Sequence, residues 1–298
     1  MHAGQSAPAS GDSLTFVSNS IYVAAPEGRT GKSMVAVGMI EALTRTVSSV
    51  GVFRPVVASG SEDAILHTLI SQPGVEQTYD EAVGVTYEQV HDDPDAALHT
   101  LVEKYALIKE RYESVVILGS DYTATTSPTE LTFNARVAAN LNTPVVLVVS
   151  GRNRTPEDIR SAAEGGLAEF RAHHAKVIAV IANRVSTIER ASSDEVDPAD
   201  LEAVRTELAK LPDVITAALP ADRLLAAPTV RAQFDAVEAN LVLGNPDLLD
   251  RESQDTLVAA MTLPNVLRRL TPESTVIMPG DRSDLLPGLL LAHRSGSF

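Results

Sequence analysis

Short apolar runs alternate with longer amphipathic segments between residues 20 and 219. The runs are rich in valine and isoleucine and are apolar at nearly every position, which is typical of parallel strands buried on both faces. This pattern predicts six strands, at 20–25, 50–57, 114–120, 143–150, 175–185 and 213–219.

Helical patterns fill the spaces between these runs. The clearest is 94–112, where apolar residues recur at helical spacing along one face. The pattern as a whole predicts helices at 31–46, 62–70, 94–112, 128–141, 155–170 and 198–210. Strands that alternate with helices indicate an α/β fold with a doubly wound, mostly parallel sheet. Ligands of such sheets bind at the carboxyl ends of the strands.

A turn-rich stretch, "LPADRLLAAP" at 219–228, indicates a boundary. We expect a flexible tail at 1–18, a large domain over 19–222 with a strand-loop-helix start, and a smaller α/β domain over 223–298. Two short strands are expected in the smaller domain, near "NLVLG" and "STVIMPG". We expect this second domain to be truncated.

Composition narrows the class of protein. The 298 residues are 44% hydrophobic and 21% charged, with no tryptophan and 4% aromatic residues, so the core must be mostly aliphatic. The formal net charge is -15, which disfavours binding to nucleic acid or to anionic membranes. No apolar run approaches the roughly 18 residues that cross a bilayer. The absence of cysteine excludes disulfides and thiol chemistry and fits the cytoplasmic location that we expect.

The stretch "APEGRTGKS" (25–33) lies between the first expected strand and the first expected helix. Its end, Gly31-Lys32-Ser33, fits the end of the phosphate-binding pattern G-x-x-x-x-G-K-[ST], although Pro26 stands at the first glycine. In such loops backbone N–H groups and the helix N-terminus hold phosphates. Lys32 would reach the outer phosphates, and the Ser33 hydroxyl would bind Mg²⁺. The alternative is an ordinary strand-to-helix turn with a solvated lysine.

Three polar residues other than Gly31, Lys32 and Ser33 are further candidates for ligand binding. Asp121 follows a strand and could hold Mg²⁺ through water, or it could be a turn aspartate. Asn183 also ends a strand, as a ligand contact or a turn residue. Arg29 could meet phosphate or be solvated. No catalytic residue is assigned. The complete candidate binding set is Glu27, Gly28, Arg29, Thr30, Gly31, Lys32, Ser33, Arg54, Asp121 and Asn183, with Ser33 and Asp121 as metal ligands.

The loop resembles that of the dethiobiotin synthetases, G-T-D-x-x-x-G-K-T. Ala25 is six positions before Gly31, and Glu27 takes the acidic position. The resemblance implies a base contact for Asn183. Two departures argue against ligase activity: Arg54 in "FRPVVASG" replaces the family's substrate-binding lysine, and Leu118 in "ILGSDYT" replaces its acidic residue. Arginine can clamp an anion but stays protonated.

One group among the relatives of the dethiobiotin synthetases resembles this sequence more closely. "VGVFRPVV", "GSDYTATTSPTELTFNARVAANLNTPVVLVVSG" and "VIAVIANRV" together resemble the N-terminal region of long bacterial phosphate acetyltransferases. "LVAAMTLPNVLRRL" and "VIMPGDRSDLLPGLLLAHRS" resemble the DRTGG domain that follows it there. The family transfers an acetyl group between coenzyme A and phosphate, in a C-terminal domain that nothing in this chain resembles.

The resemblance therefore implies a regulatory and assembly portion of such an enzyme. Its expected ligand is a phosphate-bearing effector, ATP, ADP or NADH, bound with Mg²⁺, and the expected assembly is a homo-oligomer. We expect neither nucleic acid nor membrane as a partner. Two other hypotheses stay open: a stand-alone ATP-dependent ligase or ATPase, and a purely structural oligomerisation module with a relic loop.

Overall fold

The computed structural model describes residues 20–60, 62–120, 129–186 and 197–296. The chain divides after Pro220 into two compact units. Asp121 lies outside the described residues, so its expected role in metal binding stays a prediction.

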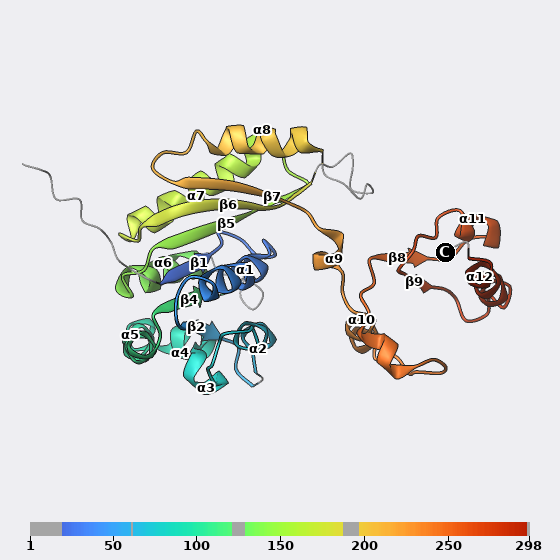
Figure 1. Cartoon of the computed structure of the whole chain (residues 1–298), viewed down its shortest axis with the longest axis horizontal. Coiled ribbons are helices and arrows are strands. Elements are labelled where there is room, and N and C mark those ends of the chain that lie inside the picture. Colours follow the sequence, from blue (N-terminus) through green and yellow to red (C-terminus); the bar gives the residue numbers. More distant parts are fainter. Residues whose placement is uncertain (1–19, 61, 121–128, 187–196, 297–298) are drawn as a thin grey trace, which may run out of the picture. The chain divides into compact units, whose positions relative to one another are not determined.

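The first unit contains a seven-stranded sheet in the order β3-β2-β4-β1-β5-β6-β7, with every strand pair parallel (Figure 1). The strands are β1 (Ile21–Ala24), β2 (Val50–Val57), β3 (Val83–Thr86), β4 (Ser114–Leu118), β5 (Val145–Arg152), β6 (Val177–Ser186) and β7 (Ile215–Pro220). The helices are α1 (Lys32–Thr44), α2 (Ala64–Ile70), α3 (Tyr79–Ala82), α4 (Tyr87–Asp92), α5 (Pro94–Arg111), α6 (Thr129–Asn140), α7 (Pro156–Ala172) and α8 (Pro198–Leu208). The expected doubly wound α/β sheet is confirmed.

The apolar runs are continuous because helices cover both faces of the sheet. Tyr22 and Ala24 in β1 belong to a core cluster that includes residues of α5 to α8. Val23, between them, belongs to a second cluster with residues of α1 to α3. Successive side chains of a strand point to opposite faces, so β1 contributes to both clusters. The carboxyl ends of the strands remain as the edge where polar loops meet.

Side-chain caps fix where several helices begin. Asp63 caps α2: its Oδ1 accepts from the backbone N–H groups of Ile65 and Leu66 at 2.8 and 3.0 Å. Asp93 caps α5 in the same way, and Pro94 follows it at the first helical position. Both aspartates accept backbone N–H groups that have no partner within the helix, and the proline sets a helical φ angle.

The second unit is built around a small parallel pair of strands. Its elements are α9 (Arg223–Ala226), α10 (Val230–Ala236), the 3₁₀ helix η2 (Pro246–Asp250), β8 (Asp255–Val258), α11 (Leu263–Leu267), β9 (Ser274–Ile277) and α12 (Leu285–Arg294). Ala259, Val266 and Leu285 form its fully buried core. The core is small, because three residues of this unit within 221–296 are fully buried in an apolar cluster.

One expected strand is wrong and the other is confirmed. Residues 240–244, "NLVLG", form no strand, and β8 lies further along the chain. Val242 and Leu243 are more than nine-tenths exposed, so this apolar run has no sheet to join. β9 lies where "STVIMPG" predicted it.

Candidate functional site

The loop between β1 and α1 opens at the carboxyl edge of the sheet. Gly31 ends the loop in the left-handed region, at φ 77°, and α1 begins at Lys32. A Cβ atom at position 31 would lie 2.6 Å from Nδ2 of Asn183, so only glycine fits without a shift. Gly31 has no side chain with which to cap α1. The first N–H groups of the helix therefore suit an anion at this end.

The loop lysine is buried at the same edge. Lys32 is 3% exposed, and its Nζ donates to the backbone carbonyl of Ser120, just after β4. Ser33 follows it and is half-buried. The ammonium group is thus placed between the ends of β1 and β4. A phosphate at the start of α1 would compete with the Ser120 carbonyl for this donor.

Asn183, at the end of β6, holds the loop. It is 9% exposed, and its Nδ2 donates to the backbone carbonyl of Thr30 at 2.9 Å. The neighbouring Arg184 donates from Nη1 to the backbone carbonyl of Arg29 at 3.3 Å. Two consecutive residues of β6 therefore fix the loop backbone. In this geometry the Asn183 amide contacts the loop, whereas the resemblance implied a contact with a nucleotide base.

Glu27 joins the loop to the end of β5. Its two carboxylate oxygens accept from the guanidinium of Arg154, with Nη2 at 2.7 Å from Oε2. The hydrogen bond to Glu27 raises the pKa of Arg154 above its usual value. Both side chains are about one-third exposed, so the pair fixes the position of the loop more than it stabilises the fold.

These residues enclose a cavity of about 610 Å³. Its lining combines the loop with the ends of β5 and β6 and one residue of α2: Glu27, Gly28, Arg29, Thr30, Gly31, Lys32, Ser33, Ile65, Ser150, Arg152, Asn153, Arg154 and Arg184. The lining holds four arginines and one lysine against a single carboxylate. In a chain of net charge -15, this is a local concentration of positive charge.

Two features of the cavity lining are energetically unfavourable. Burial and the neighbouring Arg152 lower the pKa of Arg184, because two guanidinium groups share one partly desolvated region. Three lining residues other than glycine have left-handed backbones: Arg29 at φ 59°, Asn153 at φ 53° and Arg184 at φ 62°. Such conformations cluster at ligand sites, where the surrounding structure holds them in place.

Arg54 is placed elsewhere. It is 3% exposed and does not line the cavity described above. Its Nη1 donates to the carbonyl oxygens of Leu118 and Gly119, and its Nε donates to Asp63 at 3.1 Å. It therefore ties β2 to the end of β4 and to the cap of α2. The expectation that Arg54 clamps an anion stays a prediction, with its donors engaged by protein groups here.

Sequence reasoning missed two arginines at the end of β5: Arg152 is its last residue, and Arg154 lies two residues further on. Arg152 and Arg154 stand in "SGRNR", directly after an expected buried strand. The carboxyl ends of neighbouring parallel strands meet at one edge, so two cations there were a usable signal. The partner of Glu27 could not be found in this way, since 127 residues separate it from Arg154.

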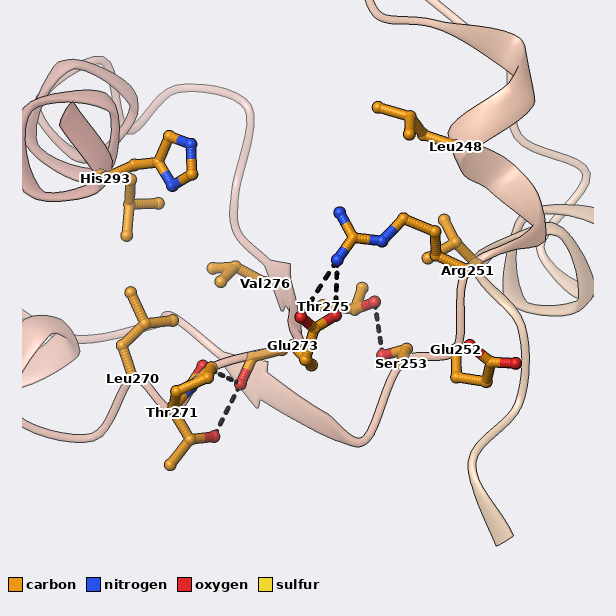
Figure 2. Close-up of a pocket in the computed structure, with 14 residues that line it drawn as sticks. Leu248, Arg251, Glu252, Ser253, Leu270, Thr271, Glu273, Thr275, Val276 and His293 are labelled. Carbon is orange, nitrogen blue, oxygen red and sulfur yellow. Dashed lines mark hydrogen bonds and ion pairs between the residues drawn. The ribbon is translucent and has the colours of Figure 1, made fainter. Parts of the chain in front are cut away.

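A second cavity, of about 440 Å³, lies within the second unit. Figure 2 shows Arg251 in a two-pronged ion pair with Glu273, both contacts at 3.0 Å. Ser253 is hydrogen-bonded to Thr275 at 2.8 Å across the start of the strand pair. The polar groups that face one another here satisfy each other, and His293 of α12 lies across the cavity. Nothing about these contacts singles out a ligand class.

In residues 20–60, 62–120, 129–186 and 197–296, no group of three or more histidine, aspartate or glutamate side chains could hold a metal ion. Over the same residues, no helix is both long and apolar enough to pass through a bilayer.

The parallel sheet, the glycine-lysine-serine loop and the helix that follows it define a P-loop NTPase-like α/β fold. The family model described as "AAA domain" matches residues 19–229, and the model described as "DRTGG domain" matches residues 234–296. The chain belongs to this AAA domain family and carries a DRTGG domain after it.

Curated relatives extend this result. The chain is 25% identical over 290 residues to the phosphate acetyltransferase of Nitratidesulfovibrio vulgaris, and 26% identical over 291 residues to that of Synechocystis sp.. Each match covers 95% of this chain and 40% of the relative. The resemblance to the N-terminal region of phosphate acetyltransferases is thereby confirmed, and the chain spans well under half the length of these relatives.

Solved structures also match in part. A nucleotide-binding protein from Archaeoglobus fulgidus, in complex with ADP, is 17% identical with a TM-score of 0.39, covering 70% of this chain and 83% of that one. A ParA family ATPase from Chlorobium tepidum is 12% identical with a TM-score of 0.41, covering 68% and 85%.

Proposed function

We propose that the cavity at the β1–α1 loop binds a nucleotide, ATP or ADP, through its phosphates. The observation that carries this proposal is the charge of the lining: five cationic residues line the cavity at the N-terminus of α1 in a strongly acidic protein. Phosphate oxygens would accept from the first N–H groups of the helix and from Lys32.

A magnesium ion fits the same arrangement. Ser33 lines the cavity one residue after the lysine, and its hydroxyl would be one ligand of the ion. Asp121, which follows Ser120, is the second proposed ligand. The ion would offset part of the phosphate charge, and Arg152 and Arg184 would offset more.

The proposed role is regulatory. Phosphate acetyltransferases transfer an acetyl group between coenzyme A and phosphate, and 60% of the length of the matched relatives lies outside the alignment with this chain. We propose that the reaction belongs to that unmatched part. This chain would then sense ATP, ADP or NADH in the cytoplasm and contribute to a homo-oligomer.

Replacing the loop lysine tests the nucleotide site. We expect Lys32→Ala to weaken binding of Mg-ATP and Mg-ADP by roughly 10- to 100-fold, because a charge-assisted hydrogen bond contributes about 1.5–3 kcal/mol. Isothermal titration calorimetry measures the affinities, and circular dichroism checks the fold. Lys109→Ala, on the exposed side of α5, is the control and should bind as the parent does. Equal affinity of all three proteins would favour a relic loop.

An acetyl-transfer assay tests the proposal that the reaction belongs to the part of the relatives outside the alignment with this chain. Incubated with acetyl-CoA and phosphate, the purified 298-residue chain is expected to release no coenzyme A above the rate without protein. A thiol reagent measures the release directly, because the chain itself has no cysteine to react with it. Sustained turnover would show that the transfer site lies within these residues and would overturn the regulatory proposal.

A further inference from the structure

A separate cavity of about 380 Å³ opens beside the first turns of α6, near the carboxyl end of β2. It shares no described residue with the cavity at the loop. Its walls come from β2, from α4 and the start of α5, and from α6. Val56, Val90, Pro94 and Phe133 make much of this wall apolar.

One carboxylate in this lining is nearly out of reach of solvent. Glu130, in the first turn of α6, is 6% exposed. Its Oε1 accepts from the Tyr87 hydroxyl at 2.9 Å. Its Oε2 is buried, and no donor among the residues that the structure describes lies within hydrogen-bonding distance of it. A buried carboxylate with a single neutral donor is poorly compensated for its lost hydration.

The arginine in this lining is paired with a carboxylate other than Glu130. Arg136 also lines the cavity, but its Nη2 is paired with Asp95 at 2.6 Å. Asp95 is 86% exposed on its side chain, so this pair faces solvent. The buried end of the cavity therefore presents the Glu130 carboxyl group, and the open end presents a paired cation.

The position of Glu130 is fixed by the next turn of α6. Asn134 is buried, and its Nδ2 donates to the Glu130 carbonyl at 3.0 Å and to the Ser120 hydroxyl at 2.9 Å. Its Oδ1 accepts from the Tyr22 hydroxyl at 2.6 Å. Burial raises the pKa of Tyr22, so the hydroxyl keeps its proton as a donor. The carboxylate of Glu130 thus extends from a rigid turn.

We propose that this cavity binds a small molecule with a primary ammonium group on an apolar chain. The ammonium group would sit against the Glu130 carboxylate, and the chain would lie along Val56, Val90 and Phe133. A metal ion fits less well, because Ca²⁺ and Mg²⁺ need several oxygen ligands and this lining offers one carboxylate. The net charge of -15 raises the local concentration of cationic ligands.

The test uses n-butylammonium as the probe on the full chain. Saturation-transfer NMR and titration should show saturable binding at millimolar concentrations, with no saturable binding of 1-butanol or butyrate. Glu130→Gln keeps the shape and removes the charge, and should weaken binding at least 10-fold. Glu110→Gln, exposed on α5, is the matched control and should leave the affinity unchanged.

A second variant keeps the test decisive if Glu130→Gln folds poorly. Val90→Phe fills the apolar wall with Glu130 intact, and should also block n-butylammonium. Mg-ATP titration of the same variants is a separate readout, because the proposal does not depend on the nucleotide site. Three results would each overturn it: no saturable binding of n-butylammonium, equal binding of 1-butanol, or full affinity in both cavity variants.

Discussion

Gly84→Ala is expected to lower the free energy of unfolding of the first unit by about 3–5 kcal/mol, the range of severe core substitutions. Gly84 is buried in β3, next to β2. An added Cβ would lie 2.1 Å from the Pro55 carbonyl oxygen and 2.5 Å from Cδ2 of Leu101. The first contact is with backbone that is held in the sheet, so relief requires β3 to move away from β2.

Urea titration followed by circular dichroism measures this effect, because the chain has no tryptophan for fluorescence. Gly165→Ala is the control. It lies within α7, and an added Cβ there would meet nothing within 4 Å. Alanine should stabilise this helix by about 0.5–1 kcal/mol. If Gly84→Ala cost less than about 1 kcal/mol, the close packing of β3 on β2 would be wrong.

The central strands could be predicted because burial on both faces leaves little room for polar residues. β1, β2 and β4 lie within the expected apolar runs, and β5, β6 and β7 overlap theirs and extend one or two residues beyond them. β3 was missed, since "VGVT" is only four residues long and lies at the edge of the sheet. In the second unit, exposed "NLVLG" was mistaken for a strand because hydrophobicity alone does not show whether a partner strand exists.

Features of the candidate site that depend on one short segment could be predicted from the sequence. Contacts between residues that are far apart in the sequence could not. The strand-loop-helix context predicted where α1 begins, at Gly31 and Lys32, because one short segment determines this geometry. Their role in binding a ligand stays a prediction. Asn183 was placed at the correct edge, but its contact with the Thr30 carbonyl depends on the loop shape. Arg54 has the charge of an anion ligand, yet its donors reach protein carbonyls and Asp63. The direction of the Arg54 side chain determines these contacts, and the spacing of residues in the sequence does not reveal that direction.

Gly31→Ala is expected to weaken Mg-ATP binding by roughly 100-fold or more, beyond the loss from Lys32→Ala, because it displaces the backbone that we propose as the phosphate site. Alanine at φ 77° is strained by about 1–2 kcal/mol. Its Cβ would also press on Nδ2 of Asn183, which donates to the Thr30 carbonyl. The loop would have to leave β6, and the first N–H groups of α1 would lose their alignment.

Gly74→Ala is the control that separates the effect of backbone strain on stability from an effect on nucleotide binding. Gly74 is also left-handed, at φ 87°, and an added Cβ would lie 2.9 Å from a Thr44 methyl carbon, outside the loop cavity. Both variants should lower the free energy of unfolding by about 1–2 kcal/mol, since both force alanine into the same backbone region. Only Gly31→Ala should lose nucleotide affinity when both are titrated calorimetrically. If Gly74→Ala lost it equally, the effect would be general destabilisation. If Gly31→Ala kept it, the loop backbone would not be the phosphate cradle.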